Sequence, residues 1–114
     1  MTQQVDIARF QATTGGLVLL GKVAAAFLRQ LEPWRQNFAA KTAAGETRAM
    51  AELLHKMKGS CYAISAHDAA AQFAAAEHAL QEGDAAAWAE QHAAVLDVLR
   101  QIEEELIALR PAGQ

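Results

Sequence analysis

The sequence predicts an all-α fold: an antiparallel four-helix bundle with a short additional N-terminal helix. The whole chain, residues 1–114, is predicted to be a single domain. Apolar residues recur at helical spacing in several long segments, and glycine or proline falls between them. No segment shows the strict alternation of a half-buried strand. A hydrophobic content of 53% in 114 residues suffices for one core.

The first helix is expected from about Gln4 to Ala12, ending at the breaker formed by residues 13–16 (TTGG). The second carries an apolar seam in steps of three and four, as in a helical bundle. Pro33 lies inside this second helix. Because the seam stays in phase across the proline, we expect a kink there and no true break. The seam consists of Leu17, Leu20, Ala24, Phe27, Leu31, Trp34 and Phe38.

Gly45-Glu46 is expected to open the third helix. The fourth is expected to begin near Ser65, where Ser65 and Asp68 have the spacing of a capping box. Gly83-Asp84 would end the fourth helix and cap the fifth, which Pro111 would stop. The apolar face of the third helix is Met50, Leu53, Leu54, Met57, Cys61 and Ile64, and that of the fifth is Trp88, His92, Val95, Leu99, Ile102, Leu106 and Leu109.

Charge and composition exclude several classes of function. The net charge of -3 gives no sign of the positively charged surface that binds nucleic acid, so we expect no nucleic-acid partner. The apolar run from Leu17 to Leu28 is broken by Lys22 and is too short to cross a bilayer, so we expect no membrane insertion. The N-terminus lacks the order of a secretory signal, and the single cysteine, Cys61, agrees with a reducing compartment. We therefore expect a cytoplasmic protein.

One histidine lies away from the apolar face of its helix. At about 100° per residue, His55 falls roughly 150° from the centre of the face that contains Leu54 and Met57. An imidazole can act as a neutral nucleophile near pH 7. Lys58, one turn on, could neutralise phosphoryl oxygens, and a glycine in mid-helix, Gly59, suggests a steric purpose. The alternative is an ordinary solvated histidine beside a lysine.

Residues 55–61 (HKMKGSC) resemble the signature of histidine-containing phosphotransfer (HPt) domains. That signature is a histidine, a lysine three positions on, a glycine next and then two small residues. Residues 64–66 (ISA) resemble the family's following step, except that Ser65 stands where glycine is usual. A capping role for Ser65 at the start of the fourth helix would explain this departure. Residues 74–80 (AAAEHAL) resemble the family's next helix, which commonly carries a glutamate at the place of Glu77.

This resemblance implies a site. His55 would accept the phosphoryl group on Nε2, Lys58 would stabilise the phosphoryl oxygens, and Glu77 would accept a hydrogen bond from Nδ1-H. The alternative for Glu77 is a boundary carboxylate that reaches solvent. Lys56 and Arg48 either add to the positive electrostatic potential around His55 or are ordinary solvated surface charges. The partner would dock on Ala51, Glu52, Gly59 and Tyr62, with neighbouring residues of the second helix.

The partners implied are receiver domains of response regulators and a hybrid sensor histidine kinase. Mg²⁺ would be on the receiver, with no cofactor or metal on this chain, and the sequence has no phosphate loop for autokinase activity. We expect the protein to be a monomer. His67 and His78 have no assigned role. Two alternatives remain: an adaptor that binds a receiver without accepting phosphate, and a ligand- or metal-binding bundle that uses His92 and Glu77.

Overall fold

The computed structural model describes residues 3–109. All regular structure in this range is helical, without a strand, so the all-α prediction is confirmed. Consecutive helices are joined by short connections, three of which contain a glycine. The helices are α1 (Ile7–Thr13), α2 (Leu17–Ala44), α3 (Thr47–Ala63), α4 (His67–Glu82) and α5 (Ala85–Leu109).

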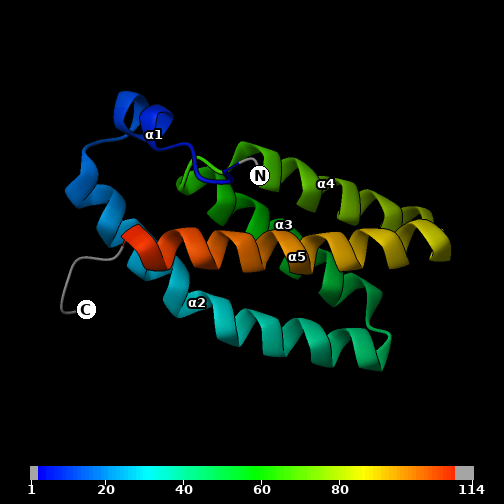
Figure 1. The fold of residues 1–114 in the computed structure, drawn as a ribbon. Coiled ribbons are helices and arrows are strands. Elements are labelled where there is room, and N and C mark those ends of the chain that lie inside the picture. The colour runs from blue at the N-terminus through cyan, green and yellow to red at the C-terminus, as the bar shows by residue number, and fades with distance from the viewer. Residues whose placement is uncertain (1–2, 110–114) are drawn as a thin grey trace.

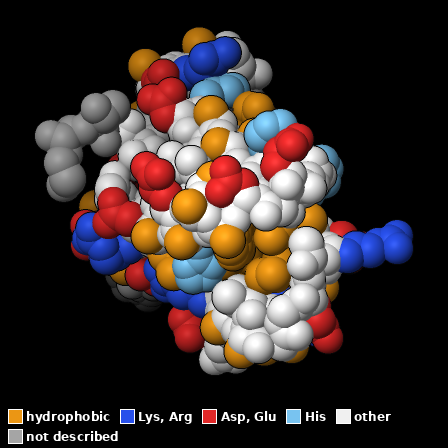
Figure 2. All heavy atoms as spheres, turned by 90° about the vertical axis from the view of Figure 1, so that its right-hand side faces the viewer, with side chains coloured by type: hydrophobic (Ala, Val, Ile, Leu, Met, Phe, Trp, Pro, Cys, Tyr) orange, Lys and Arg blue, Asp and Glu red, His pale blue; other side chains and the backbone are white. Residues whose placement is uncertain are grey.

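The four long helices lie side by side along the long axis of a molecule measuring 41 × 25 × 23 Å (Figure 1). α2 and α4 each contact both α3 and α5, and α1 contacts α2 at one end. At the opposite end, apolar side chains occupy the centre of the face and charged side chains surround them (Figure 2). Within residues 3–109, no single helix is long and apolar enough to span a membrane. Only α1 and α2 taken together meet the length and composition, and they are bent by 113°.

The first helix begins three residues later than expected. Asp6 is its N-cap, and Asp6 Oδ1 accepts a hydrogen bond from Arg9 N at 2.9 Å. Before it, the backbone N–H groups of Gln4 and Val5 donate to the Glu105 carboxylate at 2.9 and 2.8 Å. This contact with α5 satisfies backbone donors that a longer first helix would have left unpaired.

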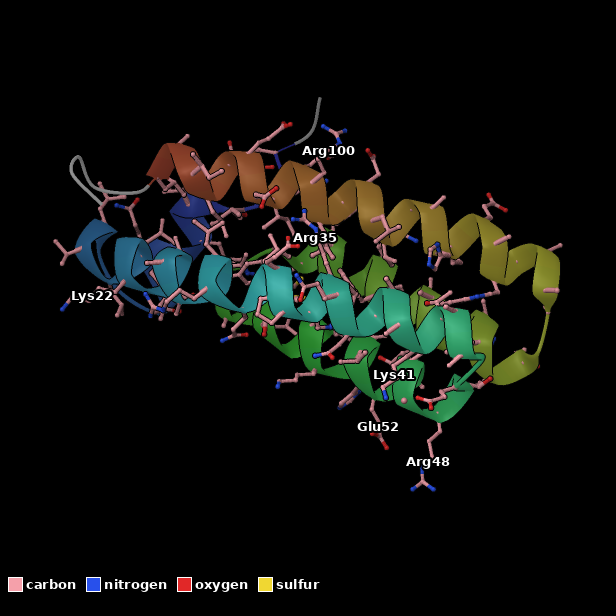
Figure 3. The ribbon with its side chains drawn as sticks, turned by 90° about the horizontal axis from the view of Figure 1, so that it is seen from below. Lys22, Arg35, Lys41, Arg48, Glu52 and Arg100 are labelled. Carbon is pink, nitrogen blue, oxygen red and sulfur yellow. The ribbon has the colours of Figure 1, made fainter. Side chains whose placement is uncertain are left out.

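The apolar seam of α2 packs into the core as predicted, with one exception. Leu17 is 59% exposed, so its assignment to the core was wrong. It occupies the first turn of α2, where the helix extends beyond the body of the bundle (Figure 1). α2 continues through Pro33 as one helix, and on another face Arg35 forms a paired hydrogen bond with Glu103 of α5 (Figure 3). The remaining six seam residues are buried: Leu20, Ala24, Phe27, Leu31, Trp34 and Phe38.

The predicted faces of α3 and α5 also form the core. Four of the predicted α3 face residues and the C-cap residue Ile64 are buried, and Leu53 is partly buried against them. In α5, Trp88, His92 and Leu109 are only partly buried, while the other four face residues are fully buried. Asp84 Oδ1 accepts from Ala87 N at 3.0 Å, which confirms the predicted cap of α5. Pro111, expected to stop this helix, lies outside the described residues.

The capping role assigned to Ser65 was wrong. α4 begins at His67, and its N-cap, Ala66, makes no side-chain capping bond. Ser65 instead has φ = 56°, the only positive φ of a non-glycine residue in the described chain. Ser65 N donates to Tyr62 O at 3.0 Å and Ala66 N donates to Cys61 O at 2.8 Å, the two bonds of a Schellman motif that closes α3. This left-handed position gives a physical reason for the family's usual glycine.

Replacing Ser65 with glycine is therefore expected to stabilise the protein. The left-handed conformation costs a residue with a Cβ about 1 kcal/mol, whereas glycine adopts it freely. Ser65→Gly should raise the free energy of unfolding by about 1 kcal/mol, and the melting temperature by about 4 °C. Ser65→Ala, which keeps the Cβ, is the matched control and should give no gain. Urea denaturation of the three proteins measures both effects, and an equal gain for alanine would contradict the backbone explanation.

Candidate functional site

His55 lies in the middle of α3 with its imidazole in solvent. The neighbouring Leu54 and Met57 are buried at 0% and 2% exposure and fix the rotation of the helix. As predicted from the helical spacing, this rotation turns His55 outward, and its side chain is 72% exposed. The imidazole is therefore held on a rigid element and is accessible to a partner protein.

Glu77 of α4 lies beside the imidazole. Phe73 and Leu80, four residues before and three after it, are both buried, so the face of α4 that packs into the bundle also carries the carboxylate. The Glu77 side chain is 14% exposed, and its Oε2 lies 3.6 Å from Nδ1 of His55. At this separation the carboxylate faces the ring nitrogen at a distance slightly longer than that of a hydrogen bond. The structure thus brings together two residues 22 positions apart in the sequence.

Lys58 also lies against Glu77. Its ammonium Nζ is 3.1 Å from Glu77 Oε1, and its side chain is 24% exposed. The Lys58 side chain therefore folds inward to the carboxylate of α4 and does not extend into solvent beside the imidazole. The buried Oε1 has this charge partner but no hydrogen-bond partner among the described residues. The sequence alone does not show whether the flexible Lys58 side chain points toward Glu77 or outward into solvent.

Gly59 has no packing role in the described chain. A Cβ built on this residue meets no heavy atom within 4 Å, apart from its own helix backbone, and its φ is not left-handed. Glycine inside a helix is less stable than alanine by about 1 kcal/mol. Neither backbone conformation nor side-chain packing within residues 3–109 requires glycine here. The open surface at Gly59 lies one helical turn from His55.

The other residues predicted to dock a partner differ in exposure. Ala51 is partly buried, and Glu52 is exposed and paired with Arg48 at 3.6 Å. Arg48 and Glu52 both project from α3 away from the bundle (Figure 3). Tyr62 is 51% exposed, and its ring stands edge-on to that of His67 with centroids 5.3 Å apart. The structure places these residues along α3, on the helix that carries His55.

The remaining histidines and the cysteine lie in different surroundings. His78 is 74% exposed and faces Glu82 at 3.8 Å, while His92 stacks on Phe38 with centroids 5.3 Å apart. Within residues 3–109, no three His, Cys, Asp or Glu side chains are grouped as metal ligands. Burial raises the pKa of the Cys61 thiol to about 12, so this thiol stays protonated and is a poor nucleophile.

Comparison with protein families matches residues 22–111 of this chain to the model described as Hpt domain. Comparison with curated proteins and comparison with solved structures gave no match. The family match covers most of the chain and includes α3, α4 and the three residues that meet at the site, His55, Lys58 and Glu77. The chain belongs to the Hpt domain family, whose members carry phosphoryl groups on histidine in two-component signalling.

Proposed function

We propose that this chain is a phosphorelay intermediate that carries a phosphoryl group between aspartates of receiver domains on Nε2 of His55. The observation that supports this most is the orientation of the imidazole. Nδ1 faces the Glu77 carboxylate at 3.6 Å, while 72% of the side chain is exposed. A carboxylate beside one ring nitrogen keeps the proton there and leaves the lone pair on the other.

The transfer exchanges one bond to phosphorus for another. Nε2 attacks the phosphorus of a receiver's aspartyl phosphate, the P–N bond forms and the P–O bond to the aspartate breaks. The aspartate leaves as a carboxylate, and Nδ1 keeps its proton. Because the ring becomes positively charged as the P–N bond forms, the Glu77 carboxylate stabilises the product. The reverse sequence returns the phosphoryl group to a second aspartate.

Lys58 serves this chemistry in two ways. Its contact with Glu77 Oε1 at 3.1 Å holds the carboxylate in place before transfer. A phosphoryl group on Nε2 would add negative charge close to the ammonium, one turn along α3 from His55. We propose that the ammonium then moves toward the phosphoryl oxygens and that Glu77 Oε2 closes onto Nδ1-H.

The proposal also covers the fold that carries His55, the cellular location of the chain and its partners. The antiparallel four-helix bundle presents His55 on a rigid face, with α1 as a lid over one end. The chain acts in the cytoplasm as a monomer, without ATP-dependent kinase activity of its own. Its partners are receiver domains and a hybrid sensor kinase, and Mg²⁺ is held by the receiver, which supplies much of the charge neutralisation.

Substitution of Gly59 with alanine should separate stability from function. Alanine should raise the free energy of unfolding by about 1 kcal/mol, because its Cβ meets nothing in the described chain. It should also slow phosphoryl transfer by about tenfold, because a misplacement of the reacting groups on the order of 1 Å costs much of the rate. Single-turnover transfer and urea denaturation measure the two effects. Ser65→Gly is the matched control, because it should be stabilised to the same extent without adding an atom near His55. If phosphoryl transfer were slowed equally in Ser65→Gly, the steric role of Gly59 would be contradicted.

The experiment that tests the proposed function uses receiver domains of the source organism, each phosphorylated with acetyl phosphate. Mixed with this chain, at least one should transfer acid-labile phosphate to it within a single turnover, whereas ATP with Mg²⁺ should transfer none. Tight binding of a phosphorylated receiver with no phosphate on this chain would instead support the adaptor.

A further inference from the structure

A groove lies between α2 and α3, beside His55 and Gly59 of α3. It encloses about 310 Å³. Lys56 and Ser60, which line it, directly follow His55 and Gly59 in α3. A partner that covers His55 and Gly59 therefore reaches the edge of this groove. The lining residues are Arg29, Gln30, Pro33, Trp34, Asn37, Leu53, Lys56, Met57 and Ser60.

The groove has an apolar floor and a basic rim. Trp34 and Met57 are 5% and 2% exposed, and the Trp34 indole is fixed by donation from Nε1 to Leu53 O at 2.9 Å. Arg29 on α2 and Lys56 on α3 are exposed and line opposite sides of the groove. A groove with a fixed aromatic floor and positively charged rims suits an apolar side chain of a partner protein that is flanked by negatively charged groups.

The two rim cations have no carboxylate partner in residues 3–109. Five other cations of the described chain pair with a carboxylate, whereas Arg29 and Lys56 do not, and neither do Arg9 and Lys22, which lie outside the groove. No Asp or Glu lines the groove. In a chain of net charge -3, two cations without partners at one groove beside His55 form a local positive field opposite in sign to that of the whole molecule.

From this arrangement we infer that the groove selects the receiver: it seats an apolar side chain of the partner's docking face, and Arg29 and Lys56 bind carboxylates that flank it. The inference rests on the proposed function, because it assigns the choice of partner to a surface adjoining the phosphorylated histidine. Receivers with an acidic docking face are preferred, and receivers with a basic one are repelled. Rim charges of this kind act mainly on the rate of association and lose effect as salt rises.

The test compares Arg29→Glu and Lys56→Glu with Arg9→Glu, which changes the net charge equally but lies on α1, outside the groove and the site. Transfer from each phosphorylated receiver is measured under second-order conditions at 20 and 300 mM salt. Each rate is divided by the rate at which phosphoramidate phosphorylates the same variant. This division removes effects on the reactivity of His55 itself.

With the receiver that reacts fastest with the wild type, each groove variant should be about tenfold slower at low salt, and the difference should shrink at high salt. Arg9→Glu should match the wild type. If receivers exchange phosphate with the wild type but the groove variants behave like Arg9→Glu, or react faster, the inference fails and the proposed function stands. If no receiver exchanges phosphate with the wild type, both fail together.

Discussion

His55→Gln should abolish phosphoryl transfer from every receiver. Glutamine has no ring nitrogen that can form a P–N bond, so the expected loss is complete. The fold should persist, because the side chain is 72% exposed and, within residues 3–109, the one charged group that it contacts is Glu77. The free energy of unfolding should therefore change by less than about 0.5 kcal/mol.

Acid-labile phosphate on the chain, followed by gel shift after mixing with a phosphorylated receiver, measures this loss. His78→Gln is the matched control, because His78 is also exposed and also faces a glutamate. That variant should accept phosphate like the wild type. Label retained by His55→Gln would place the acceptor on another residue.

Loss of the Glu77 carboxylate is expected to have the second largest effect. Glu77→Ala should slow transfer by about 100-fold and Glu77→Gln by about tenfold, within the range seen when a group that orients a reactive histidine is removed. Glutamine can still accept a hydrogen bond from Nδ1-H, but it carries no charge to stabilise the phosphorylated ring. Alanine removes both and leaves the partly buried Lys58 without its carboxylate.

A nitrogen-15 NMR measurement of tautomers separates orientation of the ring from a general structural effect. In the wild type the proton of neutral His55 should reside on Nδ1, and in Glu77→Ala the populations should approach those of a free imidazole. His92, which stacks on Phe38, serves as the internal reference and should not change. Slower transfer with an unchanged His55 tautomer would mean that Glu77 acts on the structure and not on the ring.

The sequence predicted well what depends on helical periodicity. A residue's place on a helix follows from its spacing, so the buried faces of α2, α3 and α5 and the exposure of His55 could be anticipated. Leu17 fits the same period but is exposed, because periodicity does not reveal where neighbouring helices end. Asp84 was identified as a cap because its capping bond depends only on residues close in sequence.

Features that depend on backbone conformation or on contacts between helices were missed. Ser65 has a common N-capping side chain at a suitable spacing, yet its position is the left-handed end of α3. The inward rotamer of Lys58 depends on α4, which supplies Glu77. Arg29 and Lys56 are 27 positions apart, and only the packing of α2 on α3 places them at one groove. Glu77 itself was found through the family resemblance, because periodicity alone left open a carboxylate reaching solvent.

The central claim is that Nε2 of His55 carries the phosphoryl group while Nδ1 keeps its proton toward Glu77. The most direct measurement is a nitrogen–phosphorus correlation NMR spectrum of the nitrogen-15-labelled protein after transfer from a phosphorylated receiver. Coupling of phosphorus to Nε2 of His55, with the ring proton on Nδ1, is the predicted result. Phosphorus coupled to Nδ1, or to any other histidine, would contradict the account.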